Sequence, residues 1–128
     1  MMARRKVSLN RYLAVMLGGA FGSVVRYAIG MAVFSSYSGR LPVATFGINI
    51  TGSFLIGLAF NLIPADASPV WRPLIITGVL GGYTTFSSFE WEAYSATRGV
   101  ASLYIVLSVG LGFLACWSGA AIGRYISR

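Results

Sequence analysis

The chain has 128 residues, of which 56% are hydrophobic and only 10% are charged, whereas a soluble domain typically carries about 25% charged residues. So few charges cannot coat a water-soluble particle, and the 14% of aromatic residues exclude a disordered chain. The sequence has no histidine, one cysteine (Cys116) and three acidic residues. It therefore offers no zinc site, no disulfide framework and no imidazole base for a serine nucleophile. We expect a membrane protein that is not an enzyme.

The basic residues, which give a net charge of +7, stand at the ends of the apolar segments. This distribution is typical of the flanks of membrane helices. A nucleic-acid-binding protein would instead carry a basic stripe through its folded body, so no nucleic-acid partner is expected.

Four apolar stretches predict an all-α membrane protein with a single four-helix transmembrane domain over residues 1–128. The helices are expected at about residues 11–34, 41–63, 73–97 and 100–125, because about 20 apolar residues cross a bilayer. A cleaved signal peptide is the alternative for the first stretch, since basic residues precede it. We prefer a helix, because the apolar run is too long and no small-residue cleavage site closes it.

Four crossings place both termini on one side of the membrane. Seven basic residues are then expected on that side and two on the other, with Arg26 left out: Arg4, Arg5, Lys6, Arg11, Arg72, Arg124 and Arg128 against Arg40 and Arg98. The positive-inside rule favours cytoplasmic termini.

Arg26 lies in the middle of the first helix, and an ionised residue inside a membrane is a candidate functional residue. The alternatives are that its side chain extends to the membrane interface or that it pairs with Glu90 or Glu92.

The second helix carries Thr45, Asn49, Ser53 and Asn61 at multiples of four residues, which predicts a narrow polar stripe on one helix face. Asn49 is the most costly of these residues, because a carboxamide near the bilayer centre must be hydrogen-bonded or hydrated. It either joins two helices or donates to a permeating ion, and periodicity alone does not separate the two.

The third helix contains adjacent glycines at 81 and 82 and four hydroxyl residues between positions 84 and 88. This composition predicts a helix break at Gly81–Thr84 near the membrane midplane, of the kind found where ions or substrates bind. Carbonyls before such a break suit a small hard cation, and the N-terminus of the second half-helix suits an anion. The alternative is helix packing through the Gly78–Gly82 spacing, which is our reading of Gly18–Gly22 and Gly119–Gly123.

Phe86 and Phe89 share a face of the third helix, and Thr85, Ser88 and Glu92 form a polar face. Aromatic ring edges carry partial positive charge and can line an anion path. Paired aromatic residues in a membrane helix more often contact lipid or core, which is the alternative here.

The fourth helix presents Tyr104 and Ser108 on one face, continued by Gly112 and Cys116. This polar stripe is weak, and Cys116 is expected to be buried and inert.

Three motifs resemble those of the Fluc-type (CrcB) fluoride channels. They are Gly-Gly-x-x-Gly-x-x-x-Arg-Tyr at residues 18–27, Thr-x-x-x-Asn at 45–49 and, most specifically, Gly-Gly-Tyr-Thr-Thr-Phe-Ser-Ser-Phe at 81–89. The resemblance covers nearly the whole chain in order. It implies an antiparallel homodimer of four-helix subunits with two pores in the plasma membrane, the bacterial inner membrane. Such a channel passively exports fluoride and protects the cell from its toxicity.

The resemblance also implies roles for individual residues. A structural sodium ion at the dimer interface is expected on the backbone carbonyls of Gly81 and Thr84. The expected pore and anion-binding residues are Phe86, Phe89, Asn49, Thr45, Ser88, Thr85, Ser108, Tyr104, Arg26 and Glu92.

Two features depart from the family pattern. The fourth helix keeps Ser108 but has Gly112 and Cys116 where members often carry hydroxyl groups. The seven-to-two basic bias is unexpected for a chain that inserts in both orientations, so either the rule is overridden or the partner is an oppositely oriented chain of different sequence.

Two other functions compete with a fluoride channel. A small proton-coupled multidrug exporter has a similar size, but it needs an acidic residue in the first helix, which is absent here. A non-transporting scaffold subunit would need no hydroxyl cluster near the midplane.

Overall fold

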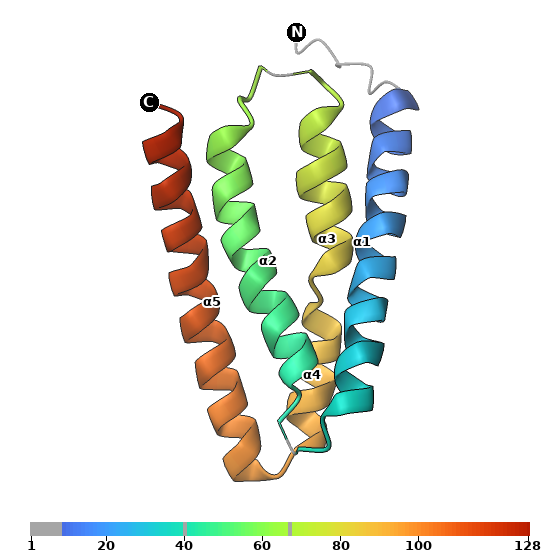
Figure 1. Cartoon of the computed structure of the whole chain (residues 1–128), viewed down its shortest axis with the longest axis vertical. Coiled ribbons are helices and arrows are strands. Elements are labelled where there is room, and N and C mark those ends of the chain that lie inside the picture. Colours follow the sequence, from blue (N-terminus) through green and yellow to red (C-terminus); the bar gives the residue numbers. More distant parts are fainter. Residues whose placement is uncertain (1–8, 40, 67) are drawn as a thin grey trace, which may run out of the picture.

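The computed structural model describes residues 9–39, 41–66 and 68–128, and this part of the chain is all-α, without strands. Its elements are α1 (Leu9–Ser36), α2 (Val43–Leu62), the π-helix η1 (Pro73–Leu80), α3 (Gly81–Tyr83), α4 (Phe86–Ser95) and α5 (Arg98–Ile126). Four roughly parallel rods result, because η1, α3 and α4 follow one another end to end in the third rod (Figure 1).

Within the described residues, three helices are long and apolar enough to cross a membrane: α1, α2 and α5, with 28, 20 and 29 residues. The third rod is divided into elements of eight, three and ten residues. None of these elements alone reaches the length of about 20 residues that a bilayer requires.

Glycines set how closely the rods pack. Gly18 and Gly22 of α1 are buried, and a Cβ atom on either would meet the backbone of η1 at Leu74 or Val79. A Cβ on Gly119 of α5 would likewise meet the backbone of Phe54 in α2. The prediction that Gly18–Gly22 and Gly119–Gly123 serve helix packing is confirmed, because small residues let helix backbones approach closely.

The π-helical segment was not predicted from the sequence. Pro73 stands at its start and lacks a backbone N–H. At its end, the N–H of Gly81 reaches the carbonyl of Ile76, five residues earlier. This wide turn is followed by the three residues of α3 and then by the interruption before α4.

The glycines of the third rod do not open its helix, so the prediction of a break at Gly81–Thr84 is wrong for the glycines, whereas Thr84 is extended. Gly81 has helical angles (φ −66°, ψ −35°), and Gly82 is also helical. The extended residues are Thr84 (φ −78°, ψ 158°) and Thr85 (φ −150°, ψ 121°). Gly82 is needed instead for packing, because a Cβ there would meet the Gly19 carbonyl of α1.

Candidate functional site

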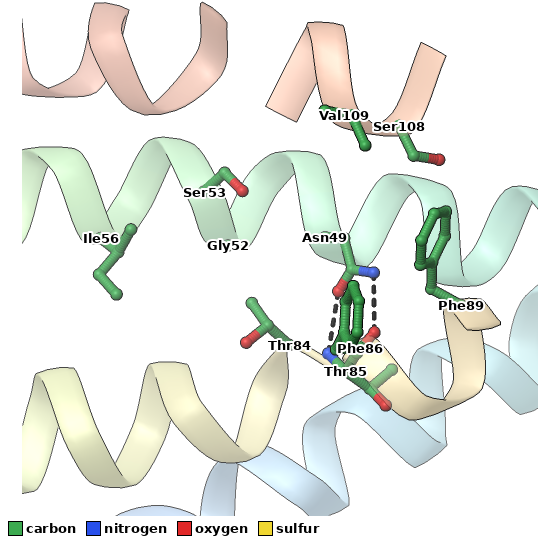
Figure 2. A pocket seen from close by; sticks show the side chains of 10 residues that line it. All are labelled: Asn49, Gly52, Ser53, Ile56, Thr84, Thr85, Phe86, Phe89, Ser108 and Val109. Carbon is green, nitrogen blue, oxygen red and sulfur yellow. Dashed lines mark hydrogen bonds between the residues drawn. The ribbon is translucent and has the colours of Figure 1, made fainter. Parts of the chain in front are cut away.

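A groove of about 300 Å³ lies between α2, α5 and the interruption of the third rod. Figure 2 shows the residues that line it: Asn49, Gly52, Ser53, Ile56, Thr84, Thr85, Phe86, Phe89, Ser108 and Val109. No lining side chain carries a charge. The groove therefore offers amide, hydroxyl and aromatic groups only.

Asn49 holds the interruption by two hydrogen bonds to one residue. Its Nδ2 donates to the Thr85 carbonyl and its Oδ1 accepts from the Thr85 N–H, both at 2.9 Å (Figure 2). The extended conformation of Thr85 presents both backbone groups to α2, as a strand would. A carboxamide has two N–H donors, and only one is used within the described part of the chain. Asn49 thus joins two helices and keeps one donor free.

The same hydrogen bonds change which backbone carbonyls are occupied. In a continuous helix the N–H of Thr85 would bond the Gly81 carbonyl, and the N–H of Ser88 would bond that of Thr84. Instead, these N–H groups donate to Asn49 Oδ1 and to Thr85 Oγ1. The carbonyls of Gly81 and Thr84 lose their helical partners and become available to a cation.

The donor set fits a small hard cation that binds through neutral oxygens. The described residues contain no group of three or more His, Cys, Asp or Glu side chains that could hold a metal ion. Backbone carbonyls at the interruption are therefore the oxygens that this part of the chain offers.

Thr85 also caps the helix that follows. Its Oγ1 accepts from the Ser88 N–H at 3.3 Å and lies 3.1 Å from Ser88 Oγ, to which it donates. This N-cap satisfies a donor that the helix start leaves free. Both predicted hydroxyl residues are thus committed to starting α4 beside the groove.

The two phenylalanines lie together but in different surroundings. Their ring centroids are 5.8 Å apart, and Phe89 also lies 5.1 Å from the ring of Tyr104. Phe89 is only 9% exposed, whereas Phe86 is 70% exposed. Both rings border the groove (Figure 2), and Phe86 faces outward from the single chain.

Glu92 forms a hydrogen-bond network with two other predicted residues, Thr45 and Tyr104. Its two carboxylate oxygens accept from Thr45 Oγ1 at 2.6 Å and from the Tyr104 hydroxyl at 2.8 Å. Thr45 and Tyr104 are buried, at 7% and 2% exposure. Three helices, α2, α4 and α5, meet at this one carboxyl group.

Arg26 contacts the interruption through the backbone. Its Nε donates to the Gly82 carbonyl at 3.0 Å, so its hydrogen-bond partner is neither Glu90 nor Glu92. Arg26 nevertheless lines a second cavity of about 330 Å³ together with Thr85, Ser88 and Glu92. The predicted polar face of Thr85, Ser88 and Glu92 therefore shares one cavity with the arginine.

Ser108 is the predicted residue whose polar atom remains unsatisfied. Its Oγ is buried and has no hydrogen-bond partner among the described residues. It borders the groove opposite Asn49 (Figure 2). An unpaired buried hydroxyl that borders a groove is available as a donor to a water molecule, an ion or a ligand.

The polar stripe of α2 does not act as one unit. Asn61 donates to the Gly57 carbonyl of its own helix and does not line the groove. Tyr83 and Thr51 were not predicted as site residues. The Tyr83 hydroxyl lies 2.9 Å from Thr51 Oγ1, beside the interruption. Tyr83 stands inside the most specific motif, so its place there was the available signal.

Comparisons with known proteins identify the family of the chain. The family model described as "CrcB-like protein, Camphor Resistance (CrcB)" matches residues 13–120. A relative from Acidobacterium capsulatum, named fluoride-specific ion channel, is 47% identical over 122 residues, which cover 91% of this chain and 98% of the relative.

Two further relatives carry the same name. One from Solibacter usitatus is 44% identical, covering 89% of this chain and 98% of its own. One from Rhizobium meliloti is 43% identical, covering 91% and 98%. The matched motifs, the extent of the family model and these identities show that the chain belongs to the CrcB-like family.

Proposed function

We propose that this chain is a fluoride-specific channel that exports fluoride passively across the plasma membrane and so protects the cell from fluoride toxicity. The observation that carries the proposal is the uncharged groove at the interruption, lined by Asn49, Ser108 and two phenylalanines. The relatives named fluoride-specific ion channels support the choice of ion.

The groove chemistry suits an anion that must be bound and then released. Fluoride is small and strongly hydrated, so its water has to be replaced by several partial donors. The free N–H of Asn49, the unpaired hydroxyl of Ser108 and the ring edges of Phe86 and Phe89 supply such donors. A full positive charge at the narrowest point would hold the ion too long.

The membrane arrangement that we propose has four crossings, with the interrupted third rod as the fourth crossing element. The interruption then lies near the midplane, and two inverted copies form an antiparallel dimer in the bacterial inner membrane, surrounded by lipid. Support comes from the 70% exposure of Phe86 and from a groove that one chain leaves open. A second copy would complete the wall of each pore.

We further propose that a structural sodium ion binds between the two copies. We propose that the carbonyls of Gly81 and Thr84 from each copy hold it, since these oxygens have lost their helical partners. When bound, the ion would supply a positive charge that attracts the partly negative oxygens of these carbonyls. Two side chains of this chain support that arrangement: Asn49 bonds both backbone groups of the extended Thr85, and Arg26 donates to the neighbouring Gly82 carbonyl.

The distribution of basic residues bears on the identity of the partner. The start of α1 and the end of α5 lie at the same end of the bundle, together with the end of α2 and the start of η1 (Figure 1). That end includes Arg11, Arg72, Arg124 and Arg128, whereas Arg98 is at the opposite end, where α5 begins. This asymmetry favours one orientation. In an antiparallel homodimer, the same chain would have to insert in both orientations despite this asymmetry. The alternative partner is a paralogous chain that inserts in the opposite orientation.

Fluoride efflux from proteoliposomes, measured with an electrode, tests the function. Efflux of fluoride that needs no proton gradient and exceeds chloride efflux is the expected result. Proton-coupled export of organic cations would instead identify a multidrug exporter, and absence of any flux would identify a scaffold. Co-purification of differently tagged copies, followed by cysteine accessibility from each side, distinguishes the homodimer from a paired paralogue.

A further inference from the structure

Residues 83–85, at and just before the interruption, all contact α2. Besides the carboxamide clamp on Thr85, Gly52 provides a notch in which a Cβ would meet the methyl group of Thr84. The ring of Tyr83 lies against the same glycine, and its hydroxyl reaches Thr51 Oγ1 at 2.9 Å. Tyr83, Thr84 and Thr85 therefore each contact α2. Among these three residues, only Tyr83 does so through a pair of side-chain hydroxyl groups.

The direction of the Tyr83–Thr51 hydrogen bond follows from counting hydrogens. The Thr51 hydroxyl has one hydrogen, and its Oγ1 lies 2.8 Å from the Gly47 carbonyl and 3.1 Å from that of Ile48. Because this hydrogen goes to a carbonyl of its own helix, Tyr83 is the donor and Thr51 the acceptor. Thr51 is thereby fixed in a rotamer that presents a lone pair to Tyr83.

Tyr83 is wedged between two helices. Its backbone nitrogen lies 2.8 Å from the position that a Cβ on Gly22 of α1 would take, while its ring lies against Gly52 of α2. It also stands between Gly81 and Thr84, the two residues with free carbonyls. The peptide groups on either side of Tyr83 carry the carbonyls of Gly82 and of Tyr83 itself, and the carbonyls of Gly81 and Thr84 each lie one peptide group further along the chain. A displacement of Tyr83 would therefore reach these two carbonyls through one intervening peptide group on each side.

We propose that the Tyr83–Thr51 hydrogen bond is a positioning contact that orients the carbonyls of Gly81 and Thr84 and so sets the affinity for sodium, without contact to fluoride. This inference rests on the sodium site of the proposed function. It assigns to two residues a role in cation affinity that is separate from the anion groove, because neither lines that groove.

The test is thermal unfolding of the purified full-length dimer during a sodium titration, with potassium replacing sodium at constant ionic strength. A cation that binds only the folded state raises the melting temperature with concentration. Tyr83→Phe and Thr51→Val are expected to raise the half-saturating sodium concentration about fivefold, the ratio that corresponds to the net strength of one hydrogen bond. The double variant should shift no further than either single variant, since both remove the same bond. Thr51→Ser keeps the acceptor and should behave as wild type.

Tyr94→Phe is the matched control, because this tyrosine of α4 is 83% exposed and its hydroxyl makes no hydrogen bond among the described residues. Its half-saturating sodium concentration should not change. An equal loss of melting temperature in sodium and in potassium, with unchanged half-saturation, would mean a purely structural bond and would overturn this inference alone. If sodium fails to stabilise the wild type, the sodium site itself is wrong and the inference falls with it.

Discussion

Replacement of Asn49 is expected to disable fluoride conduction, because this side chain holds the interruption of the third rod. Asn49→Leu keeps the size of the side chain and removes both hydrogen bonds to Thr85, which are 2.9 Å long. Asn49→Asp keeps the acceptor for the Thr85 N–H but sets an oxygen against the Thr85 carbonyl. The two variants therefore separate loss of the clamp from addition of a negative charge.

The magnitude follows from the two lost bonds. A buried N–H or carbonyl left without a partner costs about 1–3 kcal/mol. Asn49→Leu leaves both backbone groups of Thr85 unpaired, so we expect a destabilisation of about 2–6 kcal/mol. A rise of about 1.4 kcal/mol in the barrier already slows a rate tenfold. Asn49→Asp introduces a carboxylate, which would repel a permeating fluoride ion. At a separation of about 4 Å and an effective dielectric constant of about 20, this repulsion is about 4 kcal/mol. We expect at least tenfold slower fluoride efflux for Asn49→Leu and slower efflux still for Asn49→Asp.

The assay is electrode-measured efflux from liposomes, with size-exclusion chromatography to verify that the dimer persists. Asn61→Leu is the matched control, because Asn61 is on the same helix and bonds only the Gly57 carbonyl of that helix. It should conduct like the wild type. Wild-type efflux from an intact Asn49→Leu dimer would refute the view that the clamp maintains the pore.

Three further substitutions test other parts of the site. Phe86→Ile should slow efflux at least tenfold with the dimer intact, because an aliphatic group lacks the positive ring edge; unchanged efflux would remove this ring from the pore. Ser108→Ala should stabilise the protein by about 1 kcal/mol and so raise the melting temperature, because it deletes an unpaired buried hydroxyl. It should also lower fluoride efflux; efflux equal to that of the wild type would mean that the hydroxyl has no part in conduction. Gly82→Ala should lower the melting temperature, because its Cβ would meet the Gly19 carbonyl, whereas Gly47→Ala, which meets nothing within 4 Å, should be neutral or stabilising by up to about 1 kcal/mol. Equal effects of the two glycine variants in thermal unfolding would contradict the packing role.

Much of the fold was predictable because it depends on composition and periodicity. The scarcity of charge and the lengths of the apolar stretches predicted the all-α class, and three helices have the length and hydropathy to cross a membrane. The glycine spacings at 18–22 and 119–123 predicted close helix contacts, since a missing Cβ acts locally wherever two backbones approach.

The interruption was predicted close to its position but for a partly wrong reason. Adjacent glycines suggested weakness at Gly81, yet these residues are helical and pack on α1. The extended residues are Thr84 and Thr85, and what keeps Thr85 extended is an asparagine 36 positions earlier in the chain. A local propensity could not identify that partner, because the hydrogen bonds are made only after α2 and the third rod come together.

The sequence by itself determined that the chain needs an apolar solvent, that it is helical, and which short polar motif stands out within it. These properties depend on residue type and spacing, which are present before the chain folds. The tertiary structure alone decided that Arg26 bonds a carbonyl, that Glu92 unites Thr45 with Tyr104, and that the Ser108 hydroxyl stays unpaired. The physical reason is that hydrogen bonds between helices depend on distances of about 3 Å, which only the packing of the rods sets.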